Sequence, residues 1–295
     1  MHVVIGGASG FLGSALADHL SADGHTVTRL VRGRATTASE SSWDPATGHV
    51  DQAAIDRADA VVNLSGSPIS QWPRTAKRRH EILTSRLGAT TTLAEAVAKA
   101  PKPPALLSGS GMSWYGVDRG TERLTEADGP GGGFLAEVSQ QWEAAARPAI
   151  EARARVCFLR TSLVLDSAGG VLKLMLPVWK LGGGARLGRG RQRMSLITRA
   201  DWVRAVAHVL THDLSGPVNL AMPASVTNAE FTGALGRVVR RPTFLAVPGF
   251  AVRAVLGGIA EDLLGSLDVV PQVLTDSGFE FEAPDVTTAL AHAIG

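Results

Sequence analysis

The chain has 295 residues, of which 45% are hydrophobic and 19% are charged, and its formal net charge is +2. A chain of this length can bury roughly three quarters of the surface that its unfolded form exposes, so we expect one large domain or two closely packed ones. The composition is that of an ordinary globular protein, which excludes a disordered chain. The near-neutral charge gives no reason to expect a nucleic-acid partner.

Three features bear on location and membrane association. The single cysteine, Cys157, lies in an apolar run, which favours a buried side chain over a reactive thiol. The N-terminus passes from a strand directly into glycines without the features of a signal peptide, so we expect a cytoplasmic protein. Residues 244–271 are apolar, but Pro248, Arg253 and the pair Glu261-Asp262 interrupt them. This pattern predicts a core helix and no membrane partner.

Strand-like and helical segments alternate along the first half of the chain. Strands are expected at residues 2–5, 26–31, 59–64, 105–108 and 154–165, and helices at 10–22, 77–98 and 135–151. This alternation predicts an α/β fold with a doubly wound parallel sheet and helices on both faces.

A glycine-rich segment connects the first predicted strand to the first predicted helix. Its glycines allow a tight turn and a close approach of pyrophosphate to the backbone. The helix that follows has free amides at its N-terminus, and these face the anion. The segment therefore predicts a Rossmann-type dinucleotide site, although a ligand-free glycine turn remains the alternative. The cofactor-binding candidates in this segment are Gly7, Ser9, Gly10, Phe11, Leu12 and Gly13.

The residues after the second predicted strand bear on the choice of cofactor. An acidic side chain there would bind the ribose hydroxyls of NAD, but the sequence has Arg32 and Arg34. A guanidinium forms charge-assisted hydrogen bonds to phosphate, so these arginines favour NADP with its 2'-phosphate. The alternative is that both arginines are simply solvated.

A resemblance extends over nearly the whole chain. It rests on Gly7 to Gly13, Asn63-Leu64-Ser65-Gly66, Ser85-Arg86, residues 108–116, Trp142-Glu143, Arg160-Thr161, residues 188–192, residues 216–220, Arg241-Pro242 and residues 278–281. In these segments the chain resembles the epimerase-family proteins of the atypical, extended short-chain dehydrogenase/reductase superfamily, which are similar to NAD-dependent epimerases and dehydratases and have a C-terminal domain of unknown function.

The resemblance implies a division of the chain into two parts. Residues 1–165, with a returning segment near 200–220, would form an NADP-binding Rossmann domain. Residues 166–295 would mainly form a small α/β substrate or lid domain. The resemblance also implies that Leu64, Ser65, Gly66 and Ser85 contact the cofactor.

The resemblance further identifies catalytic candidates. The extended enzymes have a serine after the fourth strand, which Ser110 matches, and a Tyr-x-x-x-Lys motif on a following helix. Here Leu135 and Ser139 occupy the tyrosine and lysine positions, and a shift of one residue gives Phe134 and Val138 instead. Neither alignment supplies a proton carrier.

Tyr115 is the only tyrosine of the chain. It matches an additional tyrosine of the extended enzymes, beside the serine strand, so we expect it to line the site. A phenol with a pKa near 10 needs a neighbouring cation to transfer a proton near neutral pH. The residue four positions on is Arg119, in a loop without assured helical geometry. Direct proton transfer by Tyr115 is therefore the less favoured alternative.

The second half of the chain has weaker signals. Four arginines lie among five glycines at residues 182–193, where Arg191 or Arg193 could bind an acidic substrate, and a solvated loop is an equal alternative. His208 and His212 could share a helix face, but without an evident third ligand we expect no metal site. The basic run at residues 74–79 lacks interleaved aromatic residues, so a solvated face is favoured.

These observations lead to a functional hypothesis. The chain would be an NADP-dependent oxidoreductase or epimerase-like enzyme acting on a small, anionic substrate, with Ser110 polarising a carbonyl or hydroxyl group. The alternative is a non-catalytic regulator that binds NADPH. A homodimer is compatible with either hypothesis, and fold analogy alone cannot separate them.

Overall fold

An eight-stranded sheet runs through the centre of the computed structural model, which describes residues 1–69, 71 and 73–294. All neighbouring strands are parallel except the pair β3/β4 at one edge. The strand order is β13 (Gly216–Leu220), β8 (Val156–Thr161), β6 (Ala105–Gly111), β5 (Ala60–Asn63), β1 (His2–Gly6), β2 (Thr26–Arg32), β3 (Glu40–Asp44) and β4 (His49–Val50).

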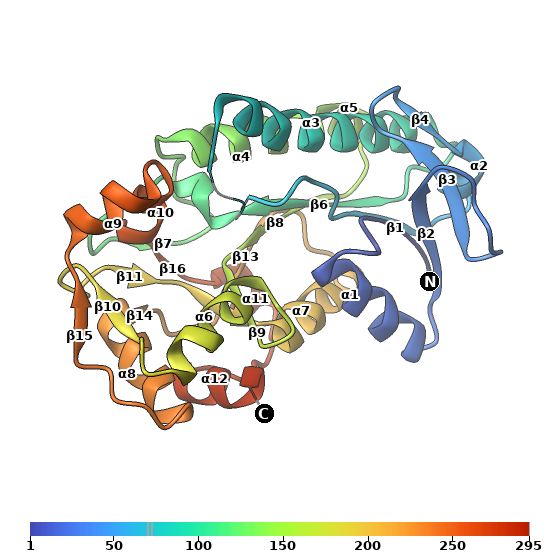
Figure 1. Ribbon diagram of the computed structural model, residues 1–295. Helices are drawn as coiled ribbons and strands as arrows, with labels where there is room; N and C mark the ends of the chain where they lie inside the picture. The colour runs from blue at the N-terminus through green and yellow to red at the C-terminus, as the bar shows by residue number, and fades with distance from the viewer. Residues whose placement is uncertain (70, 72, 295) are drawn as a thin grey trace.

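Helices cover both faces of this sheet (Figure 1). One face carries α2 (Gln52–Asp56), α3 (Ala76–Lys99), α4 (Phe134–Ala144) and α5 (Arg147–Glu151), and the other carries α1 (Phe11–Ala22), α7 (Arg199–Thr211) and α11 (Gln272–Asp276). Strand β1 shows why two cores form, since Val3 and Ile5 point into the core with α1 and α7 whereas Val4 points into the core with α3. The predicted α/β fold class is thus confirmed.

A smaller lobe, here called the lid, lies beside the carboxyl ends of the strands. It contains β9 (Leu163–Asp166), α6 (Gly170–Lys180), β10 (Ala185–Leu187), β11 (Arg193–Met194), β12 (Leu196–Thr198), β14 (Val226–Thr227), α8 (Asn228–Val238), β15 (Leu245–Val247), α9 (Gly249–Leu256), α10 (Ile259–Leu264), β16 (Asp268–Val269) and α12 (Val286–Ile294). Its strands form two-stranded pairs, one of them with β7 (Arg123–Leu124). The lid has its own apolar core, which includes Trp179, Phe231 and Leu290.

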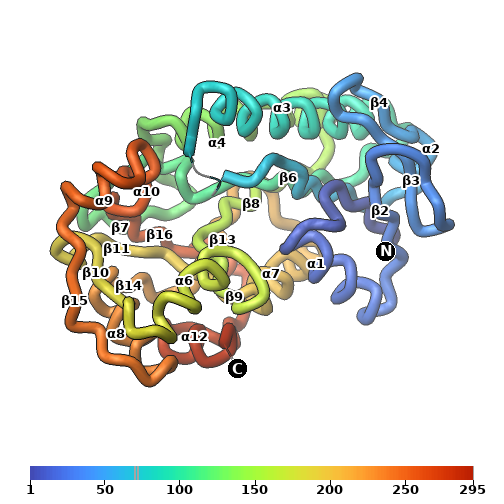
Figure 2. The backbone as a smooth tube through the Cα atoms, viewed as in Figure 1, coloured from blue at the N-terminus to red at the C-terminus, as the bar shows by residue number. Residues whose placement is uncertain are grey.

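The backbone crosses between the two lobes more than once. In Figure 2 the chain leaves the sheet after β8, enters the lid, returns through α7 to the edge strand β13, and then enters the lid again. Residues 199–220 thereby join the sheet lobe, because α7 packs on α1 and β13 pairs with β8.

Three predicted elements differ from the observed ones. The strand expected at 154–165 is two strands, because Ser162 N bonds to Leu220 O while Leu163 N bonds to Ser195 O in the lid. The helix expected at 135–151 is divided into α4 and α5. The core helix expected within 244–271 is wrong, since this segment forms β15, α9, α10 and β16. Within the described residues no helix is long and apolar enough to span a membrane.

Candidate functional site

The glycine loop joins β1 to α1 and requires glycine at specific positions. Gly7 has a φ of +81°, and a Cβ atom on it would lie 2.8 Å from the carbonyl carbon of Leu64. A Cβ atom on Gly13 would overlap the Gly7 carbonyl. Gly10 caps α1 without a side-chain hydrogen bond, and Ser9 is exposed beside it. The first amides of α1 are therefore open to an anion, as a dinucleotide diphosphate requires.

The end of β5 forms the neighbouring wall. Ser65 N donates to Asn63 Oδ1 at 3.1 Å, while the Ser65 hydroxyl is buried with no partner among the described residues. Ser85, on α3, accepts from Ser67 N at 3.0 Å and thus holds the same loop. Gly66 follows Ser65 and is exposed. The structure brings these residues beside the glycine loop, and the unpartnered hydroxyl fits a site built for a polar ligand.

Arg32 ends β2, and Arg34 follows it after Gly33, whose φ is +105°. Both arginine side chains are exposed, and within the described residues neither forms a hydrogen bond or an ion pair. Ser42 donates to Gly33 O at 2.6 Å and holds the turn between them. Both guanidinium groups are therefore available for a phosphate.

Arg199 is a further cation at the glycine loop. Its guanidinium carbon lies 4.8 Å from the centre of the Phe11 ring, and its Nη2 lies 3.5 Å from Ser14 Oγ. Its Nη1 lies 3.6 Å from Asp166 Oδ2, whereas Nε is buried without a partner within the described part of the chain. Sequence reasoning missed Arg199 because 185 residues separate it from Ser14.

Tyr115 lies at the end of the short helix η1 (Met112–Tyr115) and is fully buried. Its hydroxyl donates to Asn219 Oδ1 at 2.8 Å and accepts from Arg160 Nη1 at 3.0 Å. Burial raises the pKa of the Tyr115 phenol, against the opposing effect of Arg160. This geometry does not support the expectation that Tyr115 lines an open substrate site.

Ser110 belongs to the same buried network. Its hydroxyl donates to Glu143 Oε1 at 2.7 Å, and Arg160 holds both Glu143 oxygens at 2.9 and 3.0 Å. The Arg160 guanidinium also lies 3.6 Å from the centre of the Trp114 ring. The single hydrogen-bond donor of Ser110 is therefore used by Glu143, which argues against the predicted role of polarising a substrate.

A second serine is better placed for such a role. Ser113 is only half-buried, and its hydroxyl lies 3.3 Å from the Ser139 hydroxyl, at the carboxyl end of β6. Ser139 occupies the expected lysine position and is 3% exposed, and Leu135, at the tyrosine position, is 9% exposed. Sequence reasoning missed Ser113 because the serine matched by resemblance, Ser110, lies three residues earlier in the same stretch.

The arginines expected to bind substrate are not placed at the glycine loop. Arg191 is exposed in the lid. The Arg193 side chain reaches Ser225 O at 3.5 Å and lines a lid groove together with Glu230 and Arg237. No residue of the glycine loop lines this groove, so its geometry does not connect Arg193 with the cofactor region.

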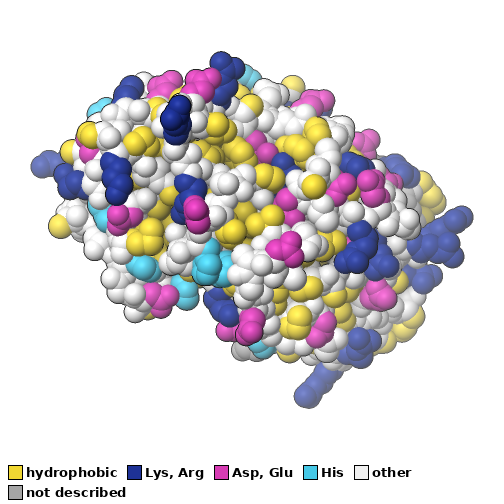
Figure 3. Space-filling view, turned by 180° about the vertical axis from the view of Figure 1, so that it is seen from behind, with side chains coloured by type: hydrophobic (Ala, Val, Ile, Leu, Met, Phe, Trp, Pro, Cys, Tyr) yellow, Lys and Arg dark blue, Asp and Glu magenta, His cyan; other side chains and the backbone are white. Residues whose placement is uncertain are grey.

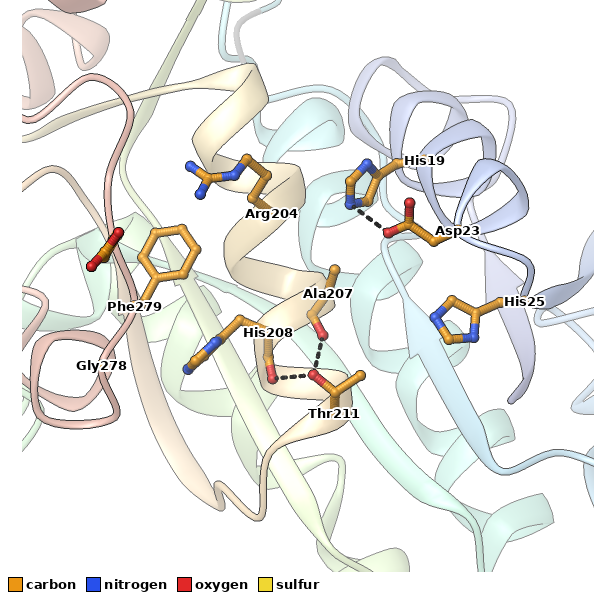
Figure 4. Close-up of a pocket in the computed structure, with 10 residues that line it drawn as sticks. His19, Asp23, His25, Arg204, Ala207, His208, Thr211, Gly278 and Phe279 are labelled. Carbon is orange, nitrogen blue, oxygen red and sulfur yellow. Dashed lines mark hydrogen bonds and ion pairs between the residues drawn. The ribbon is translucent and has the colours of Figure 1, made fainter.

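A shallow groove rich in histidine lies between the ends of α1 and α7 that are farther from the glycine loop (Figure 4). His19 lies 3.4 Å from Asp23, and the His208 ring contacts Ser277 Oγ at 2.9 Å. The rings of His208 and His212 stack with their centres 3.7 Å apart. Burial and the neighbouring His212 lower the pKa of His208. Among the described residues, no three potential ligands are grouped to hold a metal ion.

Comparison with known proteins places this geometry in context. The sequence pattern of the NAD dependent epimerase/dehydratase family matches residues 3–221, and that of a domain of unknown function, DUF1731, matches residues 247–293. Epimerase family protein Mb2239 of Mycobacterium bovis is 43% identical to this chain over 293 residues, covering 99% of the chain and 97% of the relative. Human epimerase family protein SDR39U1 is 34% identical, with full coverage of both proteins.

Two solved structures are similar over the whole chain. The crystal structure of human epimerase family protein SDR39U1 (isoform2) with NADPH has a TM-score of 0.88 and 32% identity, and the match covers 99% of each chain. A nucleoside-diphosphate sugar epimerase from Corynebacterium glutamicum has a TM-score of 0.82 and 31% identity, and this chain spans 58% of its length. The predicted resemblance to epimerase-family proteins is confirmed.

Proposed function

The chain belongs to the NAD dependent epimerase/dehydratase family, and we propose that it is an NADPH-binding oxidoreductase acting on a small carbonyl or alcohol substrate. The observation that carries this proposal is the open N-terminus of α1 behind a glycine loop that admits no Cβ atom at Gly7 or Gly13. When bound, the nicotinamide cofactor supplies or accepts a hydride.

The chain's own residues suit NADPH in particular. The amides at the start of α1 would hold the diphosphate, Arg32 and Arg34 would hold the 2'-phosphate, and the polar end of β5 would contact the rest of the nucleotide. The predicted preference for NADP agrees with the NADPH in the structure of the human relative. Arg199 would add positive charge beside the diphosphate.

For the chemical step, we assign the polarising hydrogen bond to Ser113 in place of Ser110. Ser113 keeps a half-buried hydroxyl at the carboxyl end of β6, whereas Ser110 is held by Glu143. Residues 166–295 would act mainly as the substrate lobe, where Arg191 remains available for an anionic group on the substrate. Arg193 would bind the substrate after its side chain leaves the groove that it shares with Glu230 and Arg237.

A non-catalytic NADPH-binding regulator is the second candidate. It is favoured by Leu135 and Ser139, which provide no proton-transfer pair, and by the burial of the lone tyrosine. Ser113 is the side chain that separates the two candidates, because only an enzyme needs its hydroxyl for turnover.

Titration with NADPH and NADH tests the cofactor assignment. NADPH should bind more tightly, and Arg32→Ala should weaken NADPH binding by roughly 10- to 150-fold, since a charge-assisted hydrogen bond contributes about 1.5–3 kcal/mol. NADH binding should hardly change. Arg147→Ala, at an exposed arginine on α5, is the matched control and should leave both affinities unchanged. Equal affinity of the parent protein for both nucleotides would overturn the NADP assignment.

The polarising role is tested once a screen of NADPH oxidation identifies a substrate. Removing one preorganised donor typically costs 100- to 1,000-fold in turnover, so Ser113→Ala should lose roughly that factor with NADPH affinity intact. If Ser110→Ala loses this factor while Ser113→Ala stays active, the sequence-based assignment to Ser110 holds instead. Tight NADPH binding without turnover of any compound would favour the regulator.

A further inference from the structure

Large apolar side chains are exposed on one part of the lid. Leu181, Phe244 and Phe250 are 89%, 82% and 75% exposed, which is unusual for residues of this size in a folded protein. Leu174, Val178 and Val255 are also more than half exposed. Exposed apolar side chains that gather in this way mark a surface that binds a partner or a membrane.

These side chains lie on elements that adjoin one another in the structure. Leu174, Val178 and Leu181 recur at helical spacing along the outer side of α6, opposite the buried Leu172 and Leu176. Arg241 Nε donates to Lys180 O at 2.8 Å, which places the segment before β15 against the end of α6. Strand β15 pairs with β10 and leads into α9. We call this surface of α6, β10, β15 and α9 the lid face.

The charge of the lid face is of one sign. The elements of the lid face contain Lys173 and Lys180 on α6, Arg186 on β10 and Arg253 on α9, and they contain no aspartate or glutamate. The whole chain has a net charge of only +2, so positive charge is concentrated here. Lys173, Lys180 and Arg253 are exposed among the apolar side chains. Figure 3 shows the molecule from behind, where dark blue and yellow side chains lie at the outer edge of the lid lobe and α6 is on the hidden side.

We propose that the lid face docks on the surface of an anionic lipid bilayer. Apolar side chains that enter the boundary between headgroups and acyl chains, together with lysines and arginines that meet anionic headgroups, are the features of an interfacial surface. A second copy of the chain is a poorer occupant, because it would bring the same positive charge against this face. The expectation of no membrane partner considered spanning segments only, and an interfacial face needs none.

Sedimentation with vesicles tests the proposal on the full chain. Vesicles of phosphatidylcholine with about one third phosphatidylglycerol should carry the protein into the pellet at low salt, and pure phosphatidylcholine vesicles should carry much less. Raising the salt to about 0.5 M should release it, because screening shortens the reach of the charges. Absence of binding to the anionic vesicles at low salt would overturn the proposal.

Variants locate the surface that binds. The double variant Leu181→Ser and Phe250→Ser should lower the vesicle partition coefficient by at least tenfold, because two large apolar contacts are lost. Lys173→Gln and Arg253→Gln should each lower it about fivefold. Ile150→Ser, at a half-exposed isoleucine on α5, and Arg147→Gln are the matched controls and should bind vesicles like the parent.

Two further outcomes would count against the lid face. One is an equal loss of vesicle binding in the Ile150→Ser control. The other is a concentration-dependent dimer in solution that the Leu181→Ser and Phe250→Ser double variant abolishes, which would assign the face to a second copy of the chain. NADPH titration of each variant shows that it is folded, and vesicle binding does not depend on the cofactor assignment, so failure of one proposal leaves the other standing.

Discussion

The glycine loop after β1 and the buried network of Ser110, Tyr115, Glu143 and Arg160, here called the corner, both lie at the carboxyl ends of the strands. They present their polar groups in opposite ways. The loop leaves backbone amides open at the start of α1. The corner turns its polar side chains toward one another, with Ser110 and Arg160 on Glu143 and Tyr115 on Arg160. The candidate cofactor site is therefore built from backbone groups. The side chains at the proton-transfer positions, Leu135 and Ser139, are not those of the extended enzymes. The groups that favour cofactor binding are therefore different from those that bear on proton transfer.

The largest expected effect comes from breaking the corner. Arg160→Met leaves the Glu143 carboxylate buried without its ion pair, so it should lower the free energy of unfolding by about 3–5 kcal/mol. Urea unfolding followed by tryptophan fluorescence measures this change. Adding Glu143→Gln to Arg160→Met should recover a substantial part of the loss, because the uncompensated charge is gone. If the double variant is less stable than Arg160→Met alone, the charge pairing is not what stabilises the corner.

A single added methyl group should disrupt the glycine loop. Gly13→Ala would push its Cβ atom into the Gly7 carbonyl, so the loop must open and NADPH affinity should fall by about 100-fold or more. Gly24→Ala is the matched control at the other end of α1, where φ is +80° and no atom lies within 4 Å of the added carbon. It should cost about 1–2 kcal/mol of stability through backbone strain and leave NADPH affinity unchanged. Equal NADPH affinity of Gly13→Ala and the parent protein would show that the loop does not hold the cofactor.

Tyr115→Phe sharpens the comparison by removing one hydroxyl from the corner. It leaves Asn219 Oδ1 and Arg160 Nη1 without that partner, so the free energy of unfolding should fall by about 1–3 kcal/mol. NADPH affinity should not change, and any turnover should stay within about tenfold of the parent. Because burial raises the pKa of Tyr115, the phenol stays protonated through neutral pH and the pH profile should keep its shape. A loss above about a hundredfold, with NADPH binding intact, would instead make Tyr115 the proton donor.

The smallest effect concerns Glu126, which accepts from Asn219 N on β13 at 2.9 Å and from Val273 N on α11 at 3.3 Å. Burial raises the pKa of Glu126, although these amides oppose the shift. The folded state then holds the proton more tightly than the unfolded state, so stability is fully present below the unfolded pKa near 4.3 and declines as pH rises through the folded pKa. Glu126→Gln should remove this decline.

Urea midpoints of the parent and Glu126→Gln between pH 4 and pH 8 measure the difference. The variant should gain on the parent as pH rises, by up to about 1 kcal/mol. Glu137→Gln, at an exposed carboxylate in the first turn of α4, serves as the control and should show no such trend. A constant difference between Glu126→Gln and the parent at every pH would mean that Glu126 does not titrate in this range.

Local patterns predicted most of the sheet lobe. The helix expected at 10–22 is Phe11–Ala22, and the helix expected at 77–98 is Ala76–Lys99. These elements depend on apolar periodicity and on turn residues within a few positions. The single strand expected at 154–165 is two strands, because a continuous apolar run does not show where the chain changes from one neighbouring strand to another. Pairing with β13 and then with β12 decides that point.

By itself, the sequence determined the glycine loop, the cations after β2 and the absence of a Tyr-x-x-x-Lys pair, since each depends on residue type at short spacing. Only the tertiary structure decided what Ser110 and Tyr115 do. Tyr115 meets Asn219 across 104 residues and Ser110 meets Glu143 across 33, through strands and helices that the sheet brings together. The lid face, too, was decided in three dimensions, because it joins α6 to a segment sixty-one residues later through the contact of Lys180 with Arg241.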